Sequence, residues 1–221
     1  MMDWQVIGDN IPFLVNATVM TIILAITTIV LSVALAFPLA LMRDASLQPL
    51  RWIAAAYSWS TRATPTLTLL FLTYYGLPQL GIYFDPLTAA IVGLTVSAAG
   101  YNMEYIRAGL RSVPATQHEA ARALGIPPGM ALRRLIVPQA LRVILPPLTS
   151  NLTLLLKGTS IASLVAVSEL TGEGMALIST TYKPIEILAV IAVIYLALNA
   201  VVIGVQHFVQ QRFGAPARRP T

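Results

Sequence analysis

The amino-acid sequence predicts an all-α integral membrane protein with five transmembrane helices and a short helix at the cytoplasmic surface. Of its 221 residues, 57% are hydrophobic and 10% are charged, with a mean hydropathy of +0.75. A soluble domain carries about 25% charged residues. The apolar runs are as long as the roughly 20 residues that a helix needs to cross a bilayer. Basic residues gather in alternate connections between these runs.

The five expected spans are placed by the apolar runs, within a single transmembrane domain that covers residues 1–221. Their approximate ranges are 17–42, 52–75, 87–106, 143–168 and 187–210. The first run has no charged residue from Asn10 to Met42 and is too long for the core of a signal peptide. Pro65 in the second span is expected to kink or begin a helix. The long connection, over residues 107–142, has its own helical signals.

The distribution of basic residues predicts the orientation. With the N-terminus outside, eleven arginines fall in the inner connections and the C-terminal tail, and only Lys183 falls outside. Cytoplasmic loops are enriched in Lys and Arg, so we predict an external N-terminus and a cytoplasmic C-terminus. A pI of about 9.8 would indicate nucleic-acid binding in a soluble protein. Here topology explains the positive charge, and no nucleic-acid partner is expected.

The residues needed for common catalytic and metal sites are missing from the sequence. It contains no cysteine and only two histidines, His118 and His207. Neither G-x-S-x-G nor H-E-x-x-H occurs. We therefore expect no catalytic residue, no metal site and no enzymatic activity in this chain. G-x-x-x-x-G-K-[ST], the loop that cradles nucleotide phosphates, is also absent.

A short helix is predicted in the connection 107–142. Thr116 and Glu119 have the spacing of a capping box, and Glu119 is expected to be favourably placed near the positive end of the helix dipole. Gly125 can supply a left-handed C-terminal cap, and Pro127 and Pro128 prevent continuation.

One face of this helix is predicted to carry Ala120, Ala121 and Leu124. Small side chains allow another surface to approach closely. From the residues alone, two interpretations remain open: the helix docks in a groove of a partner protein, or it lies on lipid headgroups.

The same segment carries a resemblance to a known family. EAARALGIPPGMALRRLIVPQALRVILPP resembles the EAA loop of ABC-importer permeases. TRATPTLTLLFLTYYGLP, YNMEYIRAGLRSVP and LLLKGTSIASLVAVSELTGEG resemble the second, third and fourth spans of the polar amino-acid permeases, the histidine and glutamine type. The resemblance covers about residues 18–212. It implies the permease subunit of an ATP-driven amino-acid importer, with the type I fold. The loop residues that match the family pattern are Glu119, Ala120, Ala121, Gly125 and Pro138.

The resemblance also implies an assembly in the bacterial cytoplasmic (inner) membrane. Two ATP-binding subunits, a second permease subunit and an external substrate-binding protein are the expected partners, beside the lipid bilayer. ATP and Mg²⁺ would be bound by the ATPase subunits, with no cofactor in this chain. The residues expected to couple the permease to the ATPase are Glu119, Ala120, Ala121, Leu124 and Gly125.

Two departures from the family pattern bear on the substrate. Ala63 stands where the family usually has glycine, and Gly158 stands where it often has an acidic residue. The second departure removes a negative charge from the membrane-embedded part of the chain. It favours a neutral or acidic amino acid, or a bulky derivative, over a cationic one.

Charged and hydroxyl side chains within the spans are candidates for the substrate path. A charge at the bilayer centre costs at least about 2.5–3.5 kcal/mol and needs a partner or water. The candidates are Arg62, Ser97, Glu104, Lys157 and Ser160. Structural alternatives are open for each charge: Lys157 paired with a carboxylate, Arg62 extended to the inner surface, and Glu104 paired with Arg107. A direct bridge between Arg62 and Glu104 is not expected unless the second span is bent near Pro65, because their depths differ by roughly 10 Å.

Three other functions compete with an ATP-driven permease. A secondary transporter or channel would transport without an ATPase subunit. An intramembrane enzyme would need a nucleophile and base or a metal cluster. A structural assembly subunit would show no substrate-dependent ATP hydrolysis.

Overall fold

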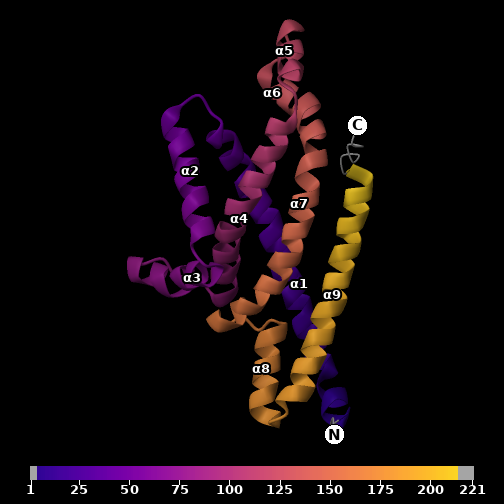
Figure 1. Cartoon of the computed structure of the whole chain (residues 1–221). Coiled ribbons are helices and arrows are strands. Elements are labelled where there is room, and N and C mark those ends of the chain that lie inside the picture. The colour runs from indigo at the N-terminus through magenta and orange to yellow at the C-terminus, as the bar shows by residue number, and fades with distance from the viewer. Residues whose placement is uncertain (1–3, 214–221) are drawn as a thin grey trace.

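The structure is a computed structural model, which describes residues 4–213. Four long helices lie side by side and form the bundle (Figure 1). They are α1 (Trp4–Arg43), α4 (Pro86–Ser112), α7 (Val137–Gly158) and α9 (Pro184–Phe213). The N-terminal end of α1 lies at the opposite end of the bundle from the C-terminal end of α9 (Figure 1). Arg218 and Arg219, which contribute to the predicted charge asymmetry, lie outside the described residues.

The first and last predicted spans each lie within one continuous helix. α1 begins at Trp4, well before the expected start at residue 17, and continues through Pro12. α9 extends three residues beyond the predicted span at each end. Both are long and apolar enough to cross a membrane.

The second predicted span, 52–75, is divided at Pro65, where a kink or a helix start was expected. α2 (Gln48–Ala63) ends before Thr64, whose backbone is extended with ψ 133°, and α3 (Thr66–Phe71) begins after Pro65. A residue before proline avoids the α region because the proline ring collides with it. A π-turn, η1 (Leu72–Gly76), and a 3-10 turn, η2 (Leu77–Leu80), complete the segment.

The connection 107–142 is largely helical. α4 continues through its first residues to Ser112, and α5 (Ala115–Ala123) follows after a short break. α6 (Pro128–Ala131) and a π-turn, η3 (Leu132–Ile136), then lead into α7 without interruption. The fourth predicted span therefore belongs to a helix that starts about 15 residues earlier than the expected position 143.

The same helix loses its α form before the predicted end of the span at 168. A 3-10 segment, η4 (Thr159–Val165), follows α7, and α8 (Leu170–Thr181) then turns away by 50°. By length and composition, two described helices can cross a membrane, or three if this bent pair counts as one span. The count of five spans is not confirmed and stays a prediction.

Small and polar side chains hold the bundle together. Gly109 on α4 faces α7, where a Cβ atom would collide with Ile144 and lie 3.0 Å from the Ala140 carbonyl oxygen. Beside this close approach, the Asn151 amide donates to Asn102 Oδ1 over 2.8 Å, and the Asn102 amide donates to Ser32 Oγ over 2.9 Å. Hydrogen bonds of this kind join transmembrane helices whose apolar surfaces gain little from leaving lipid. The chain of amides fixes α1, α4 and α7 relative to one another.

Candidate functional site

Helix α5 lies at the far end of the bundle, where it packs against α6 and η3 (Figure 1). The predicted capping box is wrong. α5 begins at Ala115 with Pro114 as its N-cap, and no side chain caps its first turn. Thr116 is therefore already inside the helix, too late to act as an N-cap. Glu119 is also beyond the first turn, which contains no acidic residue.

The C-terminal end of α5 confirms the predicted glycine cap. Gly125 has φ +67° and donates its N–H to the Arg122 carbonyl over 3.0 Å. The N–H of Ile126 reaches back to the carbonyl of Ala121 over 2.9 Å. These two bonds form a Schellman motif, in which glycine adopts the left-handed conformation at low cost. The helix therefore ends at a fixed position, with its last carbonyl groups satisfied.

The five residues predicted to couple to the ATPase do not share one face. Ala121 is only 2% exposed and packs inward, because it lies about 100° around the helix from Ala120. Ala120 and Leu124, one turn apart, point outward, and Leu124 is 77% exposed. Glu119 and Gly125 are exposed as well. The exposed residues of α5 and its cap thus include an acid, a small residue and a large apolar side chain among other polar groups, a composition compatible with docking in a protein groove.

A pocket of about 290 Å³ lies between α3, α4 and α7. Its volume is at the small end of the range for ligand pockets, about 300–1,000 Å³. Apolar side chains from α4 and α7 form part of the wall. The polar side chains in its lining are Thr66, Ser97, Tyr101, Tyr105 and Asn151. The pocket can therefore offer several hydrogen-bonding groups to a small polar molecule.

Ser97 is the predicted path residue that lines this pocket. It is almost fully buried, and its hydroxyl is 2.8 Å from the Thr66 hydroxyl at the start of α3. Arg62 does not line the pocket, but its guanidinium lies 5.8 Å from the ring centre of Tyr101, which does. The break at Pro65 therefore brings both Thr66 and Arg62 close to the same part of α4.

Lys157 and Ser160 flank the pocket without lining it. Gly158, between them in sequence, is part of the lining, and a Cβ atom there would meet no other atom within 4 Å. The Lys157 side chain is exposed and has no acid within ion-pairing distance in the described part of the chain. The proposed helix-holding pair of Lys157 with a carboxylate is therefore absent from residues 4–213. Ser160 donates to the Lys157 carbonyl over 2.8 Å.

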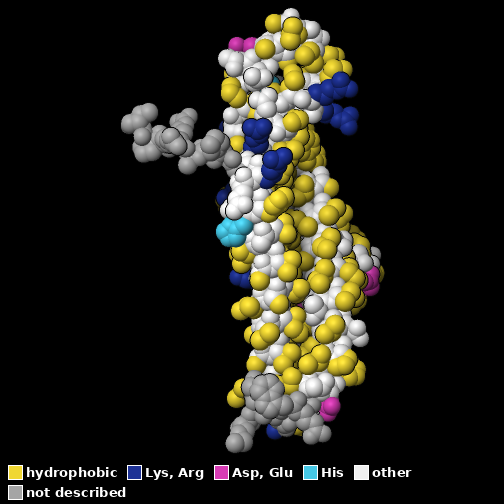
Figure 2. All heavy atoms as spheres, turned by 90° about the vertical axis from the view of Figure 1, so that its right-hand side faces the viewer, with side chains coloured by type: hydrophobic (Ala, Val, Ile, Leu, Met, Phe, Trp, Pro, Cys, Tyr) yellow, Lys and Arg dark blue, Asp and Glu magenta, His cyan; other side chains and the backbone are white. Residues whose placement is uncertain are grey.

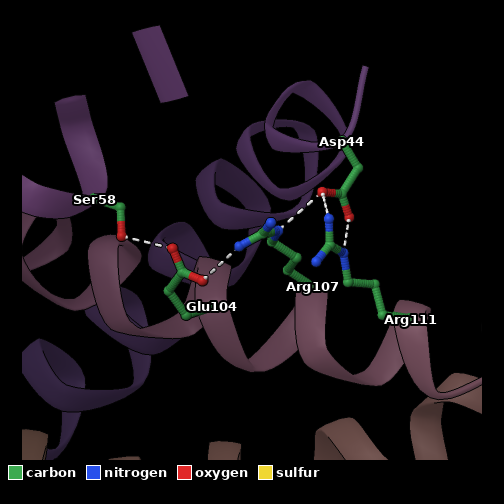
Figure 3. A network of polar contacts seen from close by, with 5 residues as sticks. All are labelled: Asp44, Ser58, Glu104, Arg107 and Arg111. Atoms are coloured by element: carbon green, nitrogen blue, oxygen red, sulfur yellow. Dashed lines mark hydrogen bonds and ion pairs between the residues drawn. The ribbon is translucent and has the colours of Figure 1, made fainter. Parts of the chain in front are cut away.

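Glu104 belongs to a different group of residues, near the end of the bundle that carries α5. It accepts a hydrogen bond from Ser58 of α2 over 2.8 Å and pairs with Arg107 over 3.4 Å (Figure 3). The interfacial pair between Glu104 and Arg107 is thus confirmed. No direct bridge joins Glu104 to Arg62 among the described residues.

The same group continues to the turn between α1 and α2. Asp44 accepts from Arg107 over 2.9 Å and from Arg111 over 2.7 and 2.8 Å (Figure 3). Burial raises the pKa of the Asp44 carboxyl, but the hydrogen bonds and charges of Arg111 and Arg107 outweigh it and hold the pKa below its ordinary value. A carboxyl group whose pKa is lowered on folding stabilises the folded state fully when the pH is above its ordinary, unfolded-state pKa. This stabilisation is lost as the pH falls through the lowered, folded-state pKa. At neutral pH the Asp44 carboxylate is therefore ionised and forms ion pairs with Arg107 and Arg111.

Several residues that line the pocket were not predicted from the sequence. Tyr101 and Tyr105 follow Ser97 at intervals of four residues, so one face of α4 carries all three. That spacing is visible in the sequence. Asn151 is a further signal, because an amide within an apolar span is costly without a partner. The meeting of these residues with Thr66 depends on the break at Pro65 and was not predictable from spacing.

The outer surface of the molecule is consistent with a bilayer. Figure 2 shows hydrophobic side chains along most of one face, while Lys and Arg side chains gather toward the end that carries α5 and α6. Large apolar side chains remain exposed along α1 and α9, among them Val30, Leu196 and Val201. Exposed apolar surface on this scale requires a non-aqueous environment or a partner.

Comparison with known proteins places this architecture among transport proteins. Residues 36–215 match the family model described as "Binding-protein-dependent transport system inner membrane component". The nopaline transport system permease protein NocM of Agrobacterium fabrum is 36% identical over 211 residues, covering 91% of this chain and 88% of that protein. The arginine transport system permease protein ArtQ of Bacillus subtilis is 30% identical, covering 96% of this chain and 97% of that protein.

A solved structure shows the same fold. The crystal structure of an amino acid ABC transporter with histidines contains a chain that is 32% identical to this one, with a TM-score of 0.87. The superposition covers 96% of this chain and 99% of that chain. The overall arrangement of the helices is therefore shared with a chain of an ABC transporter.

Proposed function

Because the chain belongs to the family of binding-protein-dependent transport system inner membrane components, we propose that it is the permease subunit of an ATP-driven amino-acid importer. The position and exposed surface of α5 are the observations that support ATP-driven transport. α5 is a capped helix at one end of the bundle, with Leu124 exposed on its outer surface. A projecting helix of this kind needs a groove to cover its apolar side chain. An ATPase subunit would supply that groove.

The expected assembly contains two ATP-binding subunits, a second permease subunit and an external binding protein. ATP and Mg²⁺ would be held by the ATPase subunits. The outward face of α5, with Glu119, Ala120, Leu124 and the Gly125 cap, would form the contact, while Ala121 would hold α5 to its own chain. Support for the lipid bilayer as the environment comes from the apolar surfaces of α1 and α9.

The pocket between α3, α4 and α7 is the proposed place where substrate passes. Its hydroxyl and amide groups suit the carboxylate and amino groups common to all amino acids. Lys157 and Ser160 are next to the lining residues Gly158 and Ile161 in sequence, and the Arg62 guanidinium lies 5.8 Å from the ring centre of the lining residue Tyr101. Glu104, in contrast, lies in the network with Ser58 and Arg107. We therefore place Ser97, Lys157, Ser160 and Arg62 on the path and assign Glu104 a structural role.

The substrate class follows from Gly158. This residue lines the pocket and leaves it without an acid at that point. A cationic side chain would find no charge partner there, so a neutral or acidic amino acid, or a bulky derivative, is favoured. Relatives named for nopaline and for arginine show that family membership alone does not fix the substrate.

The decisive test is uptake by the reconstituted system. The permease, its ATPase and a candidate binding protein are placed in liposomes, and uptake of labelled amino acids is measured with and without enclosed ATP. We expect uptake only with both the ATPase and ATP. Equal uptake without the ATPase would establish the rival function, a secondary transporter or channel. ATP hydrolysis that no amino acid stimulates, with no uptake, would favour an assembly subunit.

A further inference from the structure

A second pocket lies at the turn between α1 and α2, away from the proposed substrate path. It encloses about 380 Å³ and is lined by Arg43, Gln48, Arg51, Trp52 and Ala55. The last four of these occupy one face of the first two turns of α2. Arg43 is the last residue of α1. The turn between the helices therefore brings two guanidinium groups and an amide to the same pocket.

Neither arginine in this pocket has an acidic partner within the part of the chain that the structure describes. Asp44 is next to Arg43 in sequence, but its carboxylate is occupied by Arg107 and Arg111 (Figure 3). No other acid lies within ion-pairing distance of Arg43 or Arg51 in residues 4–213. The Nε atom of Arg43 is also buried without a hydrogen-bond partner among these residues. A buried donor without an acceptor is costly. An anion bound in this pocket would supply an acceptor and a negative charge for the unpaired arginines.

The start of α2 adds to this preference. Its N-cap residue, Leu47, provides no side-chain hydrogen bond to the first turn. Pro49 in the first turn has no N–H group, but the remaining free N–H groups of this helix N-terminus carry partial positive charge and favour anions. Two arginines beside such a terminus suit a phosphate group, because guanidinium groups bind phosphate with paired N–H donors.

The depth of the pocket indicates where the phosphate comes from. Arg43 ends the apolar segment Val6–Arg43, so the pocket lies where that segment leaves the hydrocarbon. Trp52 is 73% exposed at its edge, and tryptophan is enriched at the level of lipid headgroups. Ile53 and Trp59 continue an exposed apolar surface along α2. We propose that this pocket binds the phosphate of an anionic phospholipid headgroup, whose acyl chains lie against α2.

Binding is tested on the full-length chain in detergent, by native mass spectrometry with phosphatidylglycerol and phosphatidylethanolamine. The two arginines supply the positive charge and the paired N–H donors that attract an anionic headgroup. The double variant Arg43→Gln with Arg51→Gln should therefore bind phosphatidylglycerol at least about tenfold more weakly. The variant with both arginines changed to lysine keeps the charge and should retain most of the affinity. The control, Arg133→Gln with Arg134→Gln, removes the same charge from exposed positions outside the pocket and should change little.

A second arm separates the lipid from free phosphate. Inorganic phosphate at millimolar concentration is titrated against the delipidated protein and followed by ³¹P NMR. Phosphatidylglycerol binding that depends on Arg43 and Arg51, without phosphate binding, supports the lipid headgroup. Phosphate binding with the same dependence keeps the site but assigns it to the free ion. An equal loss in the Arg133 and Arg134 control, equal binding of the two lipids, or no effect of the double variant overturns the proposal.

Discussion

Lys157 is a cation beside the proposed substrate pocket that has no acidic partner among the described residues. A transported amino acid always carries a carboxylate, which such a lysine could meet. Replacing Lys157 by methionine keeps the length and removes the charge. A hydrogen bond to a charged group is worth about 1.5–3 kcal/mol, so uptake should fall about ten- to a hundredfold.

The measurement is initial uptake rate in proteoliposomes, together with co-purification of the ATPase. Lys157→Arg is the matched control, because it keeps the charge. Normal uptake by Lys157→Met would show that this lysine is not part of the substrate path.

Gly158 tests the substrate preference. Because a Cβ atom there meets open space in the pocket, aspartate should fit without disturbing α7. The added carboxylate should shift the ratio of cationic to neutral amino-acid uptake by about tenfold, which corresponds to about 1.4 kcal/mol. Gly158→Asn has nearly the same shape without the charge and should leave the ratio unchanged. If aspartate and asparagine have equal effects in competition uptake assays, charge at this position does not select the substrate.

Gly109 tests how tightly α4 and α7 are packed. Valine at this position would push against Ile144 and the Ala140 backbone. Overpacking a well-packed interior costs about 1–3 kcal/mol, so Gly109→Val should lower the thermal midpoint of the detergent-purified protein. Gly129 is the control position, because it is exposed and an added Cβ atom there would meet no other atom within 4 Å. If Gly109→Val is as stable as the parent, α4 and α7 can move apart to accommodate the larger side chain, and their close packing contributes little to stability.

The proposed coupling role of α5 depends on the fixed position of its C-terminal end. Gly125→Val places a β-branched residue at φ +67°, a conformation that costs L-residues about 1–2 kcal/mol. The Schellman cap should then fail, and Leu124 should no longer be held in its docking position. Substrate-stimulated ATP hydrolysis should fall while the permease stays in the membrane.

Gly129→Val controls for side-chain size near α5, because its backbone φ is not positive. Coupling is measured as the number of substrate molecules taken up per ATP hydrolysed. Unchanged coupling in Gly125→Val would exclude the cap of α5 from the mechanism.

The predicted elements differ in how well the sequence defined them. α9 was predicted within three residues at each end, because no Asp, Glu, Lys or Arg residue interrupts the largely apolar run between Glu186 and Arg212. The break in the second span was expected at Pro65, but hydropathy, which averages over Thr64 and Pro65, gave no measure of how far the two helices separate there. Hydropathy also missed the helical start at Pro128, since α6 and η3 lie outside the apolar run and η3 carries Arg133 and Arg134.

The residues that line the pocket were predictable only where local spacing along one helix brings them together. Ser97, Tyr101 and Tyr105 share a face of α4 by spacing alone. Which face of α7 meets them depends on tertiary packing, through the Asn102 and Asn151 contact and the close approach at Gly109. Local spacing contains no information about that contact.

The orientation of the molecule in the membrane remains a prediction from charge. The chain has no native cysteine, so single cysteines can be introduced at exposed positions toward the two ends of the bundle. Cysteine in place of Gln79 or Ser179 should react with an impermeant thiol reagent added to intact cells. Cysteine in place of Ser46 or Thr116 should react only after the cells are opened. The reverse pattern would invert the orientation and remove α5 from the cytoplasmic side.

The uninterrupted helix that starts at Pro128 connects the two ends of the proposed mechanism. It begins beside α5, passes through η3 and reaches the pocket lining at Gly158. At 1.5 Å per residue it is a lever about 45 Å long. A tilt of a few degrees about its middle would move each end by about 1–2 Å, the size of the helix shifts that repack interfaces. Movement of a docked α5 would therefore reshape the pocket wall mechanically, without any change in the chain between them.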